Sequence, residues 1–191
     1  VKPDISYYGG DSEKGIRVCT NLGEKLVSGT SFAAPWIARK MSYLIDVIGL
    51  DRTTAKALII DSATGWNKEE YSESIIGYGI VPINIKDILQ TPNDEIKFII
   101  TATSEKFDTY NYNIPVPLDH NTYPFISKLT MCYFPHCSRN QGVDYTNTEF
   151  DVSFGRVKKD KKNSIKIDTI NDNYQLDEYG FYTYESDARK K

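Results

Sequence analysis

The seven residues at 29–35, Gly-Thr-Ser-Phe-Ala-Ala-Pro, constrain the fold of this chain more than any other stretch, because they lead directly into a long apolar-periodic segment. In that segment apolar residues recur at spacings of three, one and three, at positions 34, 37, 38, 41, 44, 45 and 48. This stripe predicts a core helix from about Ser31 to Ile48, with Gly49 as its C-terminal stop. Ser31 would lie in the first helical turn, where unpaired N–H groups can face a negative charge.

Two interpretations of Ser31 follow from the pattern alone. Gly29 allows the backbone to approach a ligand closely, and Pro35 lies in the part of a helix that tolerates proline. Such an entry suits a nucleophilic serine. It equally suits a serine that caps the N-terminus of a core helix.

The exact residues of this stretch resemble the nucleophile motif of subtilisin-like serine proteases, Gly-Thr-Ser-x-Ala-x-Pro. Two further stretches occur in the family order. Residues 1–5, Val-Lys-Pro-Asp-Ile, resemble the strand that precedes the nucleophile, and residues 77–81, Gly-Tyr-Gly-Ile-Val, resemble the turn that closes the catalytic domain. The family usually has a small-Pro-Gly sequence where this chain has Tyr7 and Tyr8 before Gly9, and this departure concerns the conformation of that loop.

The resemblance implies an α/β fold with a parallel sheet and hydrolysis of peptide bonds through an acyl-enzyme on Ser31. Thr30 and Gly29 would shape the adjoining turn and the substrate cleft. In the family the catalytic Asp, the His in a His-Gly-Thr context and the oxyanion-hole Asn precede the nucleophile, so here they would lie upstream of Val1. Among the oxyanion donors only the backbone N–H of Ser31 can be assigned.

The resemblance therefore predicts a C-terminal fragment that is inactive alone. Its partners would be a peptide or protein substrate and the missing N-terminal half of the catalytic domain. The unpaired edge of half a parallel sheet would also favour dimerisation of the fragment. The alternative is a non-catalytic interaction module or a pseudoprotease that binds through its downstream domain.

The chain offers two histidines as a base of its own, and neither has the context of a catalytic triad. His120 is in a predicted Asp-His-Asn turn, and His136 lies at the end of a predicted strand. Cys132, His136 and Cys137 are too few and too closely spaced to predict a zinc site. No cofactor is predicted. The family often binds calcium, but no calcium-loop spacing is visible here.

The sequence pattern changes from predicted helices to short predicted strands after the turn-forming residues 91–94, and this change predicts two domains. Residues 1–92 would be the C-terminal part of the catalytic domain, and residues 93–191 a β-sandwich or jelly-roll-like accessory domain. Upstream, a strand is predicted at 15–19, a helix capped by Asp51 or Thr53 and extending to Ala63, and a short helix at 85–89. Downstream, apolar alternation predicts strands at 95–100, 110–118, 128–134, 149–154 and 164–168.

Composition excludes some classes of partner. The 191 residues carry a net charge of -3, and no apolar run reaches the length of a membrane helix. The one basic run, residues 156–162, has no interleaved aromatic residues, so a solvated hairpin tip is expected rather than nucleic-acid binding. The three cysteines show no disulfide framework, which favours a reducing, cytoplasmic compartment but leaves secretion open.

Overall fold

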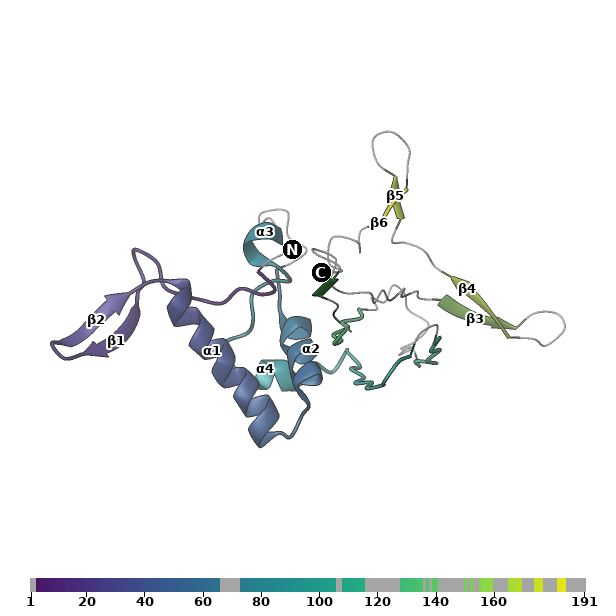
Figure 1. Ribbon diagram of the computed structural model, residues 1–191, viewed down its shortest axis with the longest axis horizontal. Helices are drawn as coiled ribbons and strands as arrows, with labels where there is room; N and C mark the ends of the chain where they lie inside the picture. The colour runs from purple at the N-terminus through teal and green to yellow at the C-terminus, as the bar shows by residue number, and fades with distance from the viewer. Residues whose placement is uncertain are drawn as a thin grey trace. The chain divides into compact units, whose positions relative to one another are not determined.

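The computed structural model describes residues 3–65, 73–105, 108–115 and 128–135, single residues between 137 and 152, and four short strands after residue 154 (Figure 1). The single residues are 137, 139, 140, 150 and 152. The chain divides into two compact units, Lys2–Tyr133 and Phe134–Lys191, the second of which also includes Val1. The predicted domain boundary after residue 92 stays a prediction.

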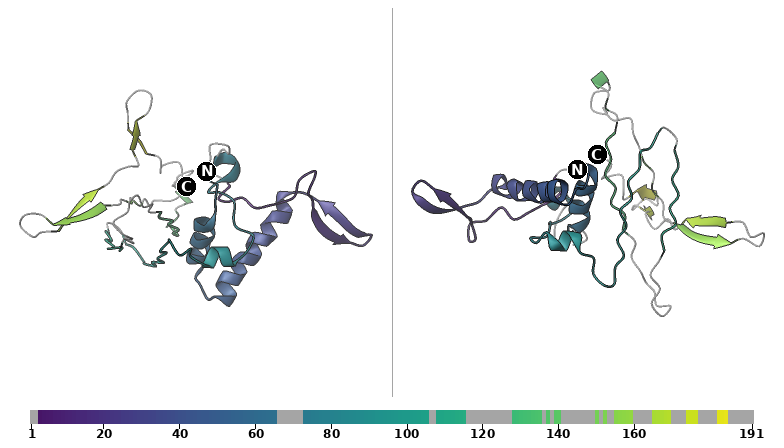
Figure 2. Two further views of the ribbon diagram at one scale, coloured as in Figure 1. Left: turned by 180° about the vertical axis from the view of Figure 1, so that it is seen from behind. Right: turned by 90° about the horizontal axis from the view of Figure 1, so that it is seen from below.

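The first regular element is an antiparallel hairpin of β1 (Ile16–Thr20) and β2 (Gly23–Val27). The register pairs Ile16 with Val27 and Thr20 with Gly23, which leaves a two-residue turn. The Thr20 hydroxyl donates to the Gly23 carbonyl at 2.8 Å across that turn. The strand predicted at 15–19 is therefore confirmed as β1, and Figure 2 shows the hairpin extending away from the helices.

The predicted nucleophile helix is α1 (Thr30–Ser42), which continues as a π-helical segment, η1 (Tyr43–Val47). Gly49, with φ 84°, ends the segment, and its N–H donates to the Ile45 carbonyl at 3.2 Å. The helix and its stop are thus confirmed. The wider final turn was not predicted, because the apolar spacing of a π-helical turn differs little from that of an α-helix.

A small core forms where α2 (Arg52–Ser62) packs against α1, η1 and α4 (Lys86–Leu89). Of the two predicted caps, Asp51 and Thr53, it is Asp51 that caps α2, by accepting hydrogen bonds from Thr53 N–H at 2.9 Å and Thr54 N–H at 3.0 Å. The apolar residues of the core are fully or nearly fully buried: Leu44, Ala55, Leu58, Ile59, Ala63, Val81 and Ile88.

The expectation that the whole apolar stripe of α1 faces a core is only partly met. Leu44 is buried and Ile37, Met41 and Ile45 are half-buried, whereas Ala34, Ala38 and Ile48 are exposed. The neighbouring helices α2 and α4 are short, so they cover only part of the stripe and leave its two ends in solvent.

Two stretches that the sequence singled out, residues 3–6 and 77–81, lie side by side. Ser6 forms a parallel bridge with Ile80, and Ile80 forms an antiparallel bridge with Thr64. The Gly77–Gly79 turn follows the short helix α3 (Glu73–Ile76), and the Tyr78 N–H donates to the Asp4 carbonyl at 2.8 Å. The described residues of 3–65 and 73–90 thus form a mixed segment of helices, hairpin and bridges. Within the described residues, the parallel bridge between Ser6 and Ile80 is the only part of the expected parallel sheet.

Downstream, two hairpins are described. β3 (Gly155–Lys159) pairs with β4 (Ile165–Thr169), and β5 (Tyr174–Leu176) pairs with β6 (Tyr182–Tyr184). The strand predicted at 164–168 is confirmed as β4. The first part of the basic run lies in strand β3 itself, whereas a hairpin tip had been expected for the whole run.

The other predicted downstream strands are not formed where the chain is described. The described residues of 95–100, 110–115 and 128–134 have no strand partners, and most of 149–154 lies outside the described part. None of the helices in the described residues combines the length and apolar character needed to cross a membrane.

Candidate functional site

Ser31 is the second residue of α1, and it is exposed. The N-cap position is Gly29, with φ 152° and ψ 155°, and no side chain caps the helix. The interpretation of Ser31 as a capping serine is therefore wrong. Among the described residues its hydroxyl has no hydrogen-bond partner, and it lies where the first-turn N–H groups have no intrahelical acceptor.

The turn before Ser31 is held by Gly9, a residue that the sequence analysis placed in a loop without assigning it a role. The Gly29 N–H donates to the Gly9 carbonyl at 2.8 Å, and the Phe32 N–H donates to the Gly29 carbonyl at 3.0 Å. A Cβ on Gly9 would lie 2.8 Å from the Gly29 carbonyl oxygen. Glycine is needed here because the two backbones approach closely. The sequence did contain a signal for this: Gly9 follows Tyr7 and Tyr8 where the family has the glycine of its small-Pro-Gly sequence.

The loop between Gly9 and β1 folds back on itself. The Asp11 carboxylate accepts from the backbone N–H of Glu13 at 2.8 Å, and its own N–H donates to the Lys14 carbonyl at 3.1 Å. The Tyr8 hydroxyl donates to the same Lys14 carbonyl. A Cβ on Gly10, which has φ 83°, would meet the Val27 carbonyl at 2.7 Å. The loop is therefore closed against β2 immediately before Ser28 and Gly29.

A buried lysine lies on the core-facing side of α1. The Lys40 side chain is 7% exposed, its ammonium donates to the Ile83 carbonyl, and it lies 5.5 Å from the centre of the Tyr7 ring. Burial lowers the pKa of Lys40, the nearby Arg39 lowers it further, and Asp87 opposes the shift. Sequence periodicity predicts apolar residues on a core-facing stripe and could not identify this lysine.

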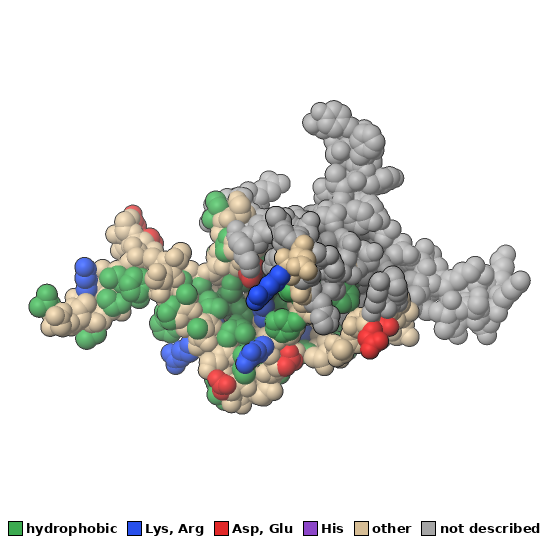
Figure 3. Space-filling model, in the orientation of Figure 1, with side chains coloured by type: hydrophobic (Ala, Val, Ile, Leu, Met, Phe, Trp, Pro, Cys, Tyr) green, Lys and Arg blue, Asp and Glu red, His purple; other side chains and the backbone are tan. Residues whose placement is uncertain are grey.

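The side of the helix that contains Lys40 also carries large apolar side chains that solvent reaches, in α1 and in η1. Trp36 is 45% exposed, Tyr43 39% and Val47 66%, and the Arg39 guanidinium lies 5.9 Å from the Trp36 ring centre. Figure 3 shows hydrophobic side chains at the surface over this part of the chain. A helix whose apolar residues extend beyond the stripe that its own core covers is typical of the interior of a larger domain.

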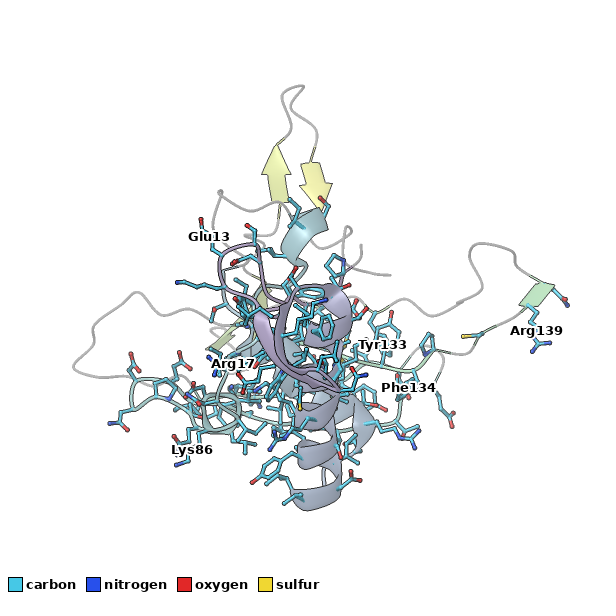
Figure 4. All side chains as sticks on the ribbon, turned by 90° about the vertical axis from the view of Figure 1, so that its left-hand side faces the viewer. Glu13, Arg17, Lys86, Tyr133, Phe134 and Arg139 are labelled. Carbon is cyan, nitrogen blue, oxygen red and sulfur yellow. The ribbon has the colours of Figure 1, made fainter. Side chains whose placement is uncertain are left out.

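Charged side chains lie on the surface of the β1–β2 hairpin, which precedes Ser31 in the chain. Figure 4 looks onto it, with Arg17 labelled, and the Arg17 guanidinium lies 3.6 Å from the Glu24 carboxylate. Both side chains are mostly exposed, so this pair adds little to stability.

The groups that would activate Ser31 are not assembled around it in the described residues. His120 and His136 both lie outside the described part of the chain. No cluster of His, Cys, Asp and Glu suited to a metal ion occurs in the residues that the structure describes. Cys19, Cys132 and Cys137 are free, and burial raises the pKa of Cys132, as does Asp4, while Lys56 opposes them.

Comparison with protein families matches residues 1–79 to the subtilase family. This range contains the three stretches singled out in the sequence, up to Gly79 of the closing turn. No curated protein and no solved structure matches the chain.

Proposed function

We infer from the match of residues 1–79 to the subtilase family that Ser31 is the nucleophile of a serine endopeptidase. Gly29 and Thr30 would shape the turn and the adjoining substrate cleft. The observation that carries this proposal is the position of Ser31: an exposed hydroxyl in the first turn of α1, after a Gly29 turn held by Gly9.

The chemistry follows from this position. A serine hydroxyl must lose its proton to a base as it attacks the peptide carbonyl, and a third group must orient that base. The carbonyl oxygen becomes an oxyanion as the Ser31 ester forms, and the backbone N–H of Ser31 would donate to it. Proton return to the departing amine and attack of water on the ester complete the hydrolysis of the peptide bond.

We propose that the base, its orienting carboxylate and the second oxyanion donor come from polypeptide outside these 191 residues. Two observations support this. Neither histidine of the chain has a triad-like context. The exposed apolar side chains of α1 and η1, Trp36, Tyr43 and Val47, have the composition of a surface that the rest of a catalytic domain would cover. The chain alone is therefore expected to be inactive.

We propose further that residues 93–191 form a β-sandwich accessory domain. The hairpins β3–β4 and β5–β6 and the alternating apolar pattern upstream of them support this. Such a domain would add substrate or partner contacts to the peptidase rather than catalytic groups.

Hydrolysis of a peptide substrate by the protein that contains the complete catalytic domain tests the proposal. Ser31→Ala should abolish turnover, with a loss of at least about a thousandfold in kcat. Ser28→Ala, at an exposed serine three residues earlier, should retain it. Equal turnover by both variants and the unsubstituted protein would contradict a nucleophilic Ser31. Absence of turnover in all three would instead favour a pseudoprotease or binding module.

A further inference from the structure

The stretch 6–10 is fixed at both ends by backbone hydrogen bonds. At one end the Ser6 N–H donates to the Gly79 carbonyl at 2.9 Å, and the Val81 N–H donates to the Ser6 carbonyl at 3.0 Å. At the other end the Gly9 carbonyl accepts from Gly29 at 2.8 Å. Tyr7 lies between these two attachments, and its ring contacts Lys40 of α1.

Lys40 provides the contact for Tyr7. An ammonium group this far from solvent is costly unless partners replace its water. Here the Ile83 carbonyl accepts its hydrogen bond, and the Tyr7 ring lies 5.5 Å from the nitrogen, within the range of a cation–π contact. A single side chain of α1 thus contacts both the stretch 6–10 and the segment that follows Val81.

The stretch therefore contacts α1 at two places, Tyr7 against Lys40 and Gly9 against Gly29. We propose that Tyr7 and Lys40 are positioning residues for Ser31, which hold the stretch 6–10 so that the Gly9 carbonyl fixes the Gly29 turn. This inference rests on the proposed function, because positioning has a catalytic meaning only if Ser31 is the nucleophile.

The contact between Gly9 and Gly29 leaves little room for the stretch to move without moving the turn. The position that a Cβ would take on Gly9 lies 2.8 Å from the Gly29 oxygen, 3.2 Å from its carbonyl carbon and 3.6 Å from the Ala33 Cβ. A side chain at position 9 would therefore push the stretch away from the Gly29 turn, and a shift of the stretch away from the turn breaks the hydrogen bond. A displacement of Tyr7 would therefore also displace the residues around Ser31.

The structural half of the proposal is tested by hydrogen exchange of the Gly29 amide in the 191-residue chain. Tyr7→Leu and Lys40→Met should accelerate that exchange at least about tenfold relative to the amide of Leu58 in the core. Tyr7→Phe keeps the aromatic ring and should restore the original rate. Arg39→Met removes a neighbouring cation, which contacts Trp36 and not Tyr7. This substitution should leave the exchange rate of the Gly29 amide unchanged.

Uniform acceleration of Gly29 and Leu58 would overturn the proposal, because it would show only a loss of global stability. An unchanged Gly29 rate in Tyr7→Leu would overturn it as well.

The functional half is tested in the protein with the complete catalytic domain, by the rate at which a fluorophosphonate labels Ser31. Tyr7→Leu should slow labelling about tenfold and lower kcat more than it changes KM, while Tyr7→Phe should match the unsubstituted protein. If Tyr7→Leu is labelled as fast as the unsubstituted protein, the positioning proposal fails and the proposed function stands. If the unsubstituted protein is never labelled, the proposed function fails, and with it the catalytic meaning of the contact, whatever the exchange data show.

Discussion

Gly79 shows how a single residue holds the two ends of the family segment together. Its φ is 119°, and a Cβ there would lie 2.4 Å from the Thr64 carbonyl oxygen. Gly79→Ala should therefore lower the free energy of unfolding by about 3 kcal/mol, through backbone strain and a clash with backbone atoms that cannot move aside. Urea denaturation measures this change.

Gly49→Ala is the matched control for that substitution. Gly49 also has a positive φ, 84°, but a Cβ there would meet nothing within 4 Å. The expected cost is about 1 kcal/mol, from strain alone. Equal costs at the two positions would show that the close approach of Gly79 to Thr64 has no energetic weight.

At this scale the sequence predicted the position of Ser31 but not how the turn is held. The motif at 29–35 placed Ser31 in the first turn of a helix, and α1 begins at Thr30. The hydrogen bond from Gly29 to Gly9 and the contact of Lys40 with Tyr7 join residues far apart in sequence. Local propensity carries no information on such pairs, so only the three-dimensional structure could reveal them.

At the scale of the elements, the carboxylate of Asp61 in α2 joins this helix to the segment that follows residue 95. Asp61 accepts from the Lys97 ammonium at 3.0 Å and from the Thr130 hydroxyl at 3.1 Å, and the Lys128 ammonium lies 3.4 Å away. Burial works to raise the pKa of Asp61, but the hydrogen bond from Lys97 and the charges of Lys128 and Lys97, with the Thr130 hydroxyl, outweigh it. The pKa lies below its ordinary value of 3.8.

This shift predicts a pH-dependent stability. A carboxylate whose pKa is lower in the folded state stabilises the fold above pH 3.8, and the contribution is lost as the pH falls through the folded pKa. Asp61→Asn should cost about 1 kcal/mol at pH 7, because the side chain is only partly buried, and progressively less below about pH 4. Urea denaturation at several pH values measures both variants.

Asp94→Asn is the control, since Asp94 is exposed in the preceding loop. It should leave stability within about 0.5 kcal/mol of the unsubstituted chain at every pH. A difference between Asp61→Asn and the unsubstituted chain that is as large at pH 3 as at pH 7 would contradict the role of the ionised carboxylate.

Prediction of elements succeeded where the signal was local. The apolar stripe with Gly49 gave α1 and η1, and the Asp51 cap gave α2. It failed where pairing decides the structure: alternation indicated strands at 95–100 and 128–134, yet these stretches have no strand partners among the described residues. A strand needs a neighbour with matching register, which alternation alone does not supply.

For the whole molecule, an exposed and a buried apolar residue of η1 make different predictions about the chain alone and the chain within a complete catalytic domain. Val47 is 66% exposed here, so Val47→Glu should change the stability of the 191-residue chain by no more than about 0.5 kcal/mol. Leu44 is fully buried, so Leu44→Ala should cost about 3 kcal/mol. Thermal or urea unfolding compares the two.

In the complete domain Val47→Glu should become as costly as Leu44→Ala, because the proposed covering surface would bury a carboxylate against apolar side chains. An unchanged free energy of unfolding for Val47→Glu, both in the 191-residue chain and in the complete domain, would show that the surface around Val47 stays in solvent.

The most direct test of the central claim is mass-spectrometric mapping of fluorophosphonate adducts. The 191-residue chain and the protein with the complete catalytic domain are treated in parallel, each with Ser31→Ala as its control. The account predicts an adduct on Ser31 in the complete protein, none in its Ser31→Ala variant and none in the 191-residue chain. An adduct on Ser31 of the chain alone would show that these residues activate the serine themselves, and the absence of an adduct in the complete protein would show that Ser31 is not a nucleophile.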